Sequence, residues 1–224
     1  MFRTELHCHS NDASPCGKES AEALVDIYSS AGYDSIVLTN HFSRDCFEYY
    51  KCNSWQEYVD LFMNAYEKLK RAAEGKLTVI LGAELRFTKN YNDYLWIGAN
   101  EEFMRNNPTM FEMKPAQFHE ICQENGWLFV QAHPFRNHMT VVKPCHLDGV
   151  EAYNGHIGHE SRNFLADAWA EEYSLIKTSG TDLHEREVPP TGGILTEEKI
   201  CSSDQLVRVL KSGNYTLLKS DKAR

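Results

Sequence analysis

The sequence has 224 residues, of which 42% are hydrophobic and 25% are charged, and this composition is typical of a globular protein rather than a disordered one. The formal net charge of -9 at pH 7 argues against a protein that holds long nucleic acid on a broad basic surface. No apolar run approaches the roughly 18 residues of a membrane-spanning helix. We therefore expect one domain over residues 1–224, which is a common size for a single barrel.

Seven cysteines are scattered through the sequence without a C-x-x-C pair, a pattern typical of a protein kept reduced in the cytoplasm. The first residues lead directly into a strand-like segment and do not form the pattern of a secretory signal peptide. We therefore expect a cytoplasmic protein that does not contact a membrane.

The first strand-like segment, residues 4–9, carries two histidines at alternate positions. Successive side chains of a strand point to opposite faces, so His7 and His9 share one face, roughly 6 to 7 Å apart along the strand. Two imidazoles placed in this way can bind one metal ion. Alternate histidines also occur on ordinary polar strand faces, so their meaning depends on the segments that follow.

Four later segments repeat one design, because each reads as an apolar strand that ends in a residue type that binds metal ions. Functional side chains at the carboxyl ends of barrel strands meet at one mouth, so these residues are expected to form one site. The segments cover residues 35–41, 77–84, 127–133 and 175–184, and the residues at their ends are His41, Glu84, His133, and Asp182 with His184.

Helices and further strands alternate with these segments. Apolar residues at helical spacing predict helices over residues 20–31, 55–74, 115–125, 161–172 and 203–211. Short apolar runs predict additional strands over residues 94–98, 149–153 and 215–218. This alternation predicts parallel strands with helices outside the sheet. A barrel is favoured over an open sheet, because ligands from strands spread along the chain converge most easily when the sheet closes.

The set of candidate ligands is larger than one tetrahedral zinc ion requires, so we expect two or three divalent ions. Mixed imidazole and carboxylate ligation suits Zn, Mn or Fe better than calcium, and the residue types do not choose among the three metals. Such a centre activates water for hydrolysis. The sequence contains no G-x-S-x-G elbow, P-loop or dinucleotide fingerprint that would indicate another chemistry.

Together these motifs resemble the PHP (polymerase and histidinol phosphatase) superfamily, and the resemblance covers nearly the entire chain. It rests on His7-x-His9, Thr39-Asn40-His41, Gly82-Ala83-Glu84, Ala132-His133-Pro134 and Gly180-Thr181-Asp182-Leu183-His184. The resemblance implies an α/β fold, namely a distorted (β/α)7, TIM-like barrel, with a di- or trinuclear metal site and phosphoesterase activity in many members. It implies that the metal ligands are His7, His9, His41, Glu84, His133, Asp182 and His184.

The sequence departs from the family pattern at two places. Many members carry an acidic residue or a histidine in the loop after the first motif, and many carry another histidine after the fourth strand, which is absent here. The presence of a third ion therefore stays open. The residues whose role as ligands the sequence does not decide are Asp12, Cys16, Asp93, Glu101 and His156.

Arg136 follows His133 by three residues, and its guanidinium group can bind a phosphate through two parallel hydrogen bonds. A structural salt bridge is the competing interpretation. Arg44, Arg86 and Arg162 also follow strand ends or begin a helix and could complete an anion pocket. The aromatic segment 42–54 could be either a lid over the substrate or a packed loop.

From these observations we expect a metal-dependent hydrolase that cleaves a small phosphomonoester, in the manner of histidinol phosphatase or nucleotide phosphatases. A water activated by the metal ions would attack phosphorus, Arg136 would position the phosphate, and Asp182 or His184 would transfer a proton. Two alternatives stay open: amidohydrolase-like attack on a carbonyl by the same site, and a non-catalytic metal-binding domain. The sequence identifies neither the physiological substrate, nor the native metal, nor the oligomeric state.

Overall fold

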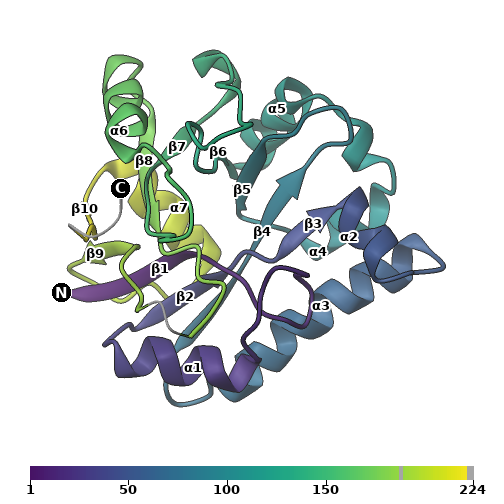
Figure 1. The fold of residues 1–224 in the computed structure, drawn as a ribbon, viewed down its shortest axis with the longest axis horizontal. Coiled ribbons are helices and arrows are strands. Elements are labelled where there is room, and N and C mark those ends of the chain that lie inside the picture. The colour runs from purple at the N-terminus through teal and green to yellow at the C-terminus, as the bar shows by residue number, and fades with distance from the viewer. Residues whose placement is uncertain (187–188, 221–224) are drawn as a thin grey trace.

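The computed structural model describes residues 1–186 and 189–220, so the last four residues of the predicted domain, 221–224, lie outside the described residues. Within the described ranges, ten strands form a mixed sheet that curls into a nearly closed barrel with helices around it (Figure 1). The strands are β1 (Phe2–Cys8), β2 (Ser35–Leu38), β3 (His41–Ser43), β4 (Thr78–Arg86), β5 (Asp93–Ile97), β6 (Leu128–Gln131), β7 (Gly149–Asn154), β8 (Ile176–Gly180), β9 (Ile194–Thr196) and β10 (Thr216–Leu217).

The helices are α1 (Ala21–Ser30), α2 (Arg44–Tyr49), α3 (Trp55–Ala72), α4 (Glu101–Asn106), α5 (Pro115–Asn125), α6 (Asn163–Glu172) and α7 (Ser203–Ser212), with single 3-10 turns η1 (Met110–Glu112) and η2 (Pro144–His146). Five of these helices lie close to the positions that the apolar spacing predicts, whereas α2 and α4 were not predicted. Serine side chains cap four of these helices by accepting a backbone N–H of the first turn, namely Ser20, Ser43, Ser54 and Ser202. None of the helices within the described ranges combines the length and the apolar character needed to cross a membrane.

The barrel closes where the chain after β8 returns to the carboxyl end of β1. The sheet order is β10-β9-β1-β2-β4-β5-β6-β7-β8, with β3 paired to β4. Beyond this order, the backbone N–H of Asp182 donates to the carbonyl oxygen of His7 at 2.8 Å, and Cys8 forms a parallel bridge with Leu183. The predicted barrel is therefore confirmed, and its closure brings the segment after β8 against the His7 strand.

The prediction of parallel pairing is wrong for β5, and β9 is a strand that the sequence analysis did not predict. β5 is antiparallel to both β4 and β6, and β9 is antiparallel to β1. The connection between β4 and β5, residues 87–92, contains no helix. A parallel crossover needs about a dozen residues or more, so this short connection permits only a hairpin.

The interior of the barrel below the carboxyl strand ends is filled by aliphatic side chains. Leu6, Val37 and Val130 from the strands form one buried cluster with Leu206 and Leu210 of α7. In Figure 1, α7 lies behind the ring of strands, consistent with its packing against this cluster. Through this cluster, α7 packs against β1, which carries His7, and against β6, which leads to His133.

We expect Leu206→Ala to lower the free energy of unfolding by about 2–5 kcal/mol, because Leu206 is fully buried in this cluster and its loss leaves a cavity. Urea denaturation followed by circular dichroism measures the change. Arg208→Ala, at an exposed position of the same helix, is the control and should change stability by no more than about 0.5 kcal/mol. Equal losses in the two variants would show that the apolar face of α7 contributes little.

The aromatic segment 42–54 is packed, in agreement with the second of its two interpretations. Phe42 is fully buried, and its ring stacks on that of Tyr58 with centroids 4.9 Å apart. Just after the segment, the indole N–H of Trp55 donates to the carbonyl oxygen of Met104 at 2.6 Å. Tyr49 is the exposed aromatic residue of the segment.

Candidate metal centre

The carboxyl ends of the barrel strands bring all the predicted ligands together. His7 lies in β1, His41 begins β3 and Glu84 lies in β4. The remaining predicted ligands follow the ends of strands β1, β6 and β8, and they are His9, His133, Asp182 and His184. The rings of His7, His41 and His184 each lie within 5.1 Å, centroid to centroid, of the His9 ring.

The carboxylate of Glu84 stands between two pairs of histidines and is 1% exposed. Its Oε1 atom lies 3.4 Å from Nε2 of His7 and 3.1 Å from Nε2 of His133. Its Oε2 atom lies 3.3 Å from Nε2 of His9 and 3.0 Å from Nδ1 of His41. Each oxygen therefore faces its own pair of imidazoles, which is the arrangement of a carboxylate that can bridge two ions.

The two oxygens of Asp182 face in different directions. Oδ1 lies 3.5 Å from Nε2 of His7 and 3.3 Å from Nε2 of His9. Oδ2 accepts hydrogen bonds from Nη2 of Arg136 at 2.8 Å and from Nδ2 of Asn154 at 3.1 Å. The salt bridge that competed with phosphate binding in the interpretation of Arg136 is therefore present, and it orients Asp182 towards the histidines.

Hydrogen bonds behind the rings determine which nitrogen of His7 and of His9 faces the centre. Nδ1 of His7 lies 2.9 Å from Oε1 of Glu151, and donation to this carboxylate oxygen places the proton on Nδ1. Nδ1 of His9 lies 3.2 Å from Oγ of Ser14, whose own proton is directed to Oδ1 of Asn40 at 3.1 Å. The neutral form of each ring, which is the form that binds metal, therefore presents an Nε2 lone pair to the centre.

These two Nε2 atoms are 3.1 Å apart, and each also faces carboxylate oxygens. Lone pairs and anionic oxygens at such distances repel one another unless a proton or a metal ion lies between them. The donor set is thus one that a divalent ion fits, since buried imidazole and carboxylate groups are the ligands of Zn, Mn and Fe.

The electrostatics of the cluster favour positive charge within it. Burial alone would lower the pKa of His7, but the carboxylates of Glu151, Asp182 and Glu84 raise this pKa well above its ordinary value. Burial would likewise raise the pKa of Glu84, but the charges of His41 and His7 hold it well below its usual range. Burial lowers the pKa of His9 to about 3, so this imidazole is neutral at pH 7, the form that binds metal.

Two of the predicted ligands have left-handed backbone conformations. The φ angle of His133 is 28° and that of Asp182 is 53°, and such angles cost on the order of 1–3 kcal/mol for residues other than glycine. The N–H of His133 donates to Oε2 of Glu151 at 3.0 Å, which fixes its backbone. Strain of this kind is typical of functional sites, where the surrounding structure compensates for it.

The sequence interpretation missed Glu151, a fully buried carboxylate of β7. It accepts from Nδ1 of His7, from the N–H of His133 and from Nδ2 of Asn154. Glu5, also fully buried, similarly joins β1 to the segment after β8 by accepting from the backbone N–H groups of His7 and Thr181. The sequence signal that could have identified these carboxylates is an acidic residue within an otherwise apolar strand.

We expect Glu151→Gln to lower metal affinity by about 10- to 100-fold, the usual effect of losing an outer partner of a ligating histidine. Both oxygens of Glu151 accept hydrogen bonds, so the amide N–H₂ of glutamine would face a donor. Titration calorimetry with Zn or Mn measures the affinity. Glu171→Gln is the control, because that side chain is 80% exposed. Unchanged affinity in Glu151→Gln would contradict this supporting role.

Two of the residues left open by the sequence are held in ion pairs with neighbouring side chains. Oδ1 of Asp12 accepts from Nζ of Lys68 at 2.7 Å. Oε1 of Glu101 pairs within α4 with Arg105 at 2.7 Å. The pair with Arg105 accounts for Glu101 without a metal ion, whereas Oδ2 of Asp12 is buried and has no partner among the described residues.

The other three open residues lie nearer the centre. Asp93 approaches His41 and Glu84, but the guanidinium of Arg86 holds both of its oxygens at 2.7 Å. The His156 ring lies 4.7 Å from that of His184, and both line a cavity of about 220 Å³ beside Asp182. Cys16 lies beside His9 and His41.

The arginines that follow strand ends are already paired in the structure. Arg44 pairs with Glu112 at 3.0 Å, and Arg86 pairs with Asp93 as described above. Arg162 donates to the carbonyl oxygen of Phe135. Within residues 1–186 and 189–220, these side chains do not form the predicted pocket of unpaired guanidinium groups.

The fold and the cluster define a class of protein, namely α/β barrels with a candidate multinuclear metal centre at the carboxyl ends of the strands. The sequence matches the model of the PHP domain family over residues 5–197, a range that contains every predicted ligand, and the chain belongs to this family. The resemblance drawn from the motifs is thus confirmed. No curated protein matches the sequence.

Solved structures with a similar fold carry different functional descriptions. A two-domain protein from Bacteroides vulgatus, containing a predicted PHP-like metal-dependent phosphoesterase, is 17% identical with a TM-score of 0.65, and the match covers 97% of this chain and 64% of that one. An amidohydrolase from Chromobacterium violaceum is 13% identical, with a TM-score of 0.56 and coverage of 97% and 98%. A lesion-specific endonuclease from Pyrococcus furiosus is 12% identical, with a TM-score of 0.61 and coverage of 99% and 59%.

At these identities the likeness establishes the fold alone. The chain spans about two thirds of the Bacteroides protein and less of the Pyrococcus protein.

Proposed function

We propose that this protein is a metal-dependent phosphoesterase that cleaves a small phosphomonoester with a water activated by two or three divalent ions. The observation that carries this proposal is the position of Glu84, whose two oxygens each face a separate pair of imidazoles. Divalent ions held there would acidify a water molecule and neutralise charge on the phosphate. Membership of the PHP family supports metal-dependent hydrolysis as the class of reaction.

In this proposal the ligands divide according to the oxygens of Glu84. His7 and His133 share one position with Oε1, and His9 and His41 share the other with Oε2. Asp182 presents Oδ1 to both positions. His184 lies on the open side of the cluster and is a further ligand or proton acceptor.

Arg136 has two tasks in the proposed reaction. Its Nη2 atom anchors Asp182, Asn154 and, at 3.4 Å, the hydroxyl of Ser161. Its Nε atom is buried and has no partner among the described residues. A buried donor without a partner costs about 1–3 kcal/mol, and a phosphate oxygen would satisfy it.

His184 and Asp182 would handle the proton. Nδ1 of His184 donates to the backbone carbonyl oxygen of Asp182 at 2.8 Å, so Nε2 is the lone-pair nitrogen. The ring lines the cavity of about 220 Å³ together with Asp182 and His156. An imidazole in this position can accept a proton from water or return one to the leaving group.

The small volume of this cavity and the net charge of -9 support a small substrate rather than a long nucleic acid. Structures with a similar fold are described as an endonuclease and an amidohydrolase. Phosphodiesters and amides are therefore the substrate classes to test against phosphomonoesters.

A substrate panel tests the proposal. The purified protein, supplied with Zn, Mn or Fe(II), is incubated with histidinol phosphate, nucleoside 5'-monophosphates, p-nitrophenyl phosphate, bis(p-nitrophenyl) phosphate, a single-stranded oligonucleotide and an amide. We expect hydrolysis of monoesters with at least one metal. Cleavage of only the diester and the oligonucleotide would overturn the monoesterase assignment. Cleavage of only the amide would support an amidohydrolase, and binding of metal without any turnover would support a non-catalytic domain.

A further inference from the structure

We propose that the thiolate of Cys16 is a metal ligand in the position formed by His9, His41 and Oε2 of Glu84. One position of the centre would then have a sulfur ligand, whereas the other would have only nitrogen and oxygen. This inference rests on the metal centre of the proposed function and adds to it a difference between its two positions.

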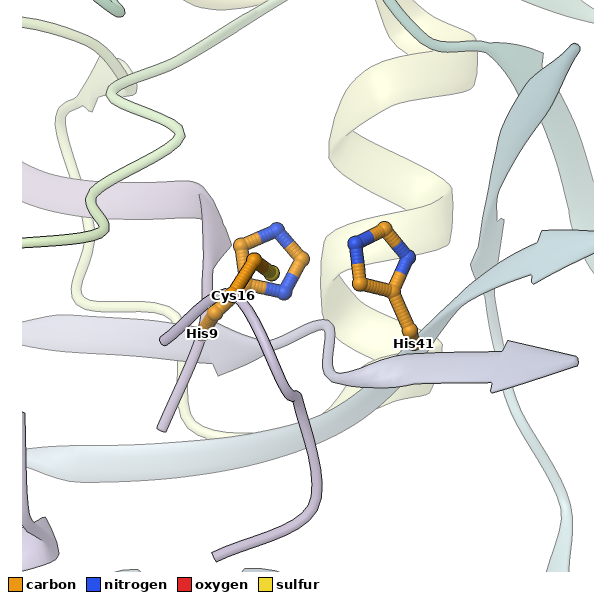
Figure 2. A group of neighbouring side chains, drawn as sticks. All are labelled: His9, Cys16 and His41. Atoms are coloured by element: carbon orange, nitrogen blue, oxygen red, sulfur yellow. The ribbon is translucent and has the colours of Figure 1, made fainter. Parts of the chain in front are cut away.

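Cys16 and the two histidines form one group of donor atoms. A sulfur atom and one nitrogen from each ring lie within 4.8 Å of one another. The rings of His9 and His41 stack with centroids 4.7 Å apart and planes inclined by 23°. Figure 2 shows the three side chains gathered at one place, although His9 and Cys16 come from the segment after β1 and His41 begins β3.

Both histidines of this group face the same oxygen of Glu84. His9 is 1% exposed, and its Nε2 lone pair lies 3.3 Å from Oε2 of Glu84. The same oxygen lies 3.0 Å from Nδ1 of His41. Two imidazoles and one carboxylate oxygen are the three ligands that belong to this position alone, because Oδ1 of Asp182 is shared with the other position, and a thiolate would supply a fourth ligand of its own. Cys16 is the described cysteine that groups with them.

The loop that carries Cys16 is folded against the site by bonds that do not involve its thiol. The N–H of Gly17 donates to the carbonyl oxygen of Ser14 at 3.1 Å, and Nδ2 of Asn40 donates to the hydroxyl of Ser10 at 3.0 Å. A Cβ atom on Gly17 would lie 2.9 Å from the backbone carbonyl of Ser10, so only glycine permits this close approach. The sulfur position is therefore prepared before any ion binds.

Cys8 is adjacent to both histidines in the sequence, but its side chain does not face the metal centre. Cys8 lies between His7 and His9, but alternate strand residues point to opposite faces. It packs with Leu24 and Tyr28 of α1 in a cluster outside the barrel interior, and its Sγ donates to the carbonyl oxygen of Val37.

A sulfur ligand would make the two positions prefer different metals. Thiolates favour Zn and other soft or borderline ions, whereas positions built from imidazole and carboxylate also accept Mn. The position of His7, His133 and Oε1 of Glu84 offers no cysteine among the described donor groups. We therefore expect one tightly held Zn and a second, more exchangeable ion.

Cobalt spectroscopy tests the inference directly. Co(II) is titrated into the full chain carrying Cys145→Ser and Cys201→Ser, which removes the two exposed cysteines. We expect visible d–d bands together with a near-ultraviolet thiolate-to-cobalt charge-transfer band. Adding Cys16→Ser or Cys16→Asp should abolish the charge-transfer band and keep d–d bands. Thermal unfolding followed by circular dichroism verifies that both variants are folded.

The outcomes separate this inference from the proposed function. d–d bands without a charge-transfer band in the parent protein, or a charge-transfer band that survives in Cys16→Ser, would overturn the thiolate ligand while leaving the centre in place. No cobalt binding at all would overturn the metal centre and the inference together. As a second readout, Cys16→Asp should lower Zn affinity by about 10-fold or more and leave Mn binding largely unchanged. Equal losses for Zn and Mn would contradict the sulfur ligand.

Discussion

Glu84→Gln is expected to lose both principal metal positions together and, with them, about 10³-fold or more of the proposed hydrolytic rate. Glu84 is buried, and each of its oxygens faces a different pair of histidines. Glutamine has the same shape but no negative charge, and its N–H₂ group would occupy the place of one oxygen. Such a rate loss corresponds to roughly 4 kcal/mol of transition-state stabilisation.

Elemental analysis and the phosphomonoester assay measure this effect in parallel. The parent protein should contain two or three equivalents of metal, and Glu84→Gln less than one. Glu112→Gln is the matched control, because its carboxylate is exposed and pairs with Arg44 outside the cluster. A Glu84→Gln protein with full metal content and full activity would refute the bridging role. Full metal content with no activity would instead limit Glu84 to a catalytic role.

Gly180→Ala is expected to disrupt the closure of the barrel and the metal centre at the same time. A Cβ atom on Gly180 would lie 2.3 Å from Cβ of His7 and 2.7 Å from Oε1 of Glu151. Neither neighbour can move freely, since His7 is fully buried in β1 and Glu151 holds its ring. The end of β8 would have to shift away from β1, and Asp182 would shift with it.

The expected loss of stability is about 1–3 kcal/mol or somewhat more, as for other overpacked positions, and metal affinity should fall in parallel. Urea denaturation and metal titration on the same preparation measure the two effects. Gly75→Ala is the control, because Gly75 has a φ of +75° and no atom within 4 Å of an added Cβ. It should cost about 1 kcal/mol through backbone strain alone and leave metal binding unchanged. Normal metal affinity in Gly180→Ala would show that β8 can move without displacing Asp182.

The two variants test two different requirements of the metal centre. Glu84→Gln changes one charge and leaves the shape of the site, so its effect reports on the ions themselves. Gly180→Ala leaves the chemistry of every predicted ligand unchanged and changes the distance between two strands. If both variants lose metal binding, the centre depends on the closure of the barrel as well as on the chemistry of its side chains.

Sequence patterns by themselves determined the class of fold and the residue types of the site. Apolar runs that end in His41, Glu84 and His133 already indicated strands with ligands at their carboxyl ends, because strand and helix periodicity are local properties of the chain. The start of a helix followed from a local signal too, namely the capping serine Ser20 before α1. The family resemblance rested on the same motifs and was confirmed by the match over residues 5–197.

Only the tertiary structure decided how these side chains pair. Periodicity predicts which face of a strand a residue occupies, but it does not predict which residues of other strands face it across the barrel. The bond between His7 and Glu151 joins residues 144 positions apart, and the division of the histidines by the two oxygens of Glu84 depends on several strands at once. The reversal of β5 and the salt bridge of Arg136 with Asp182 likewise depend on the path of the chain in space. Closure of β8 onto β1 sets these distances, and closure is a property of the whole barrel rather than of any segment.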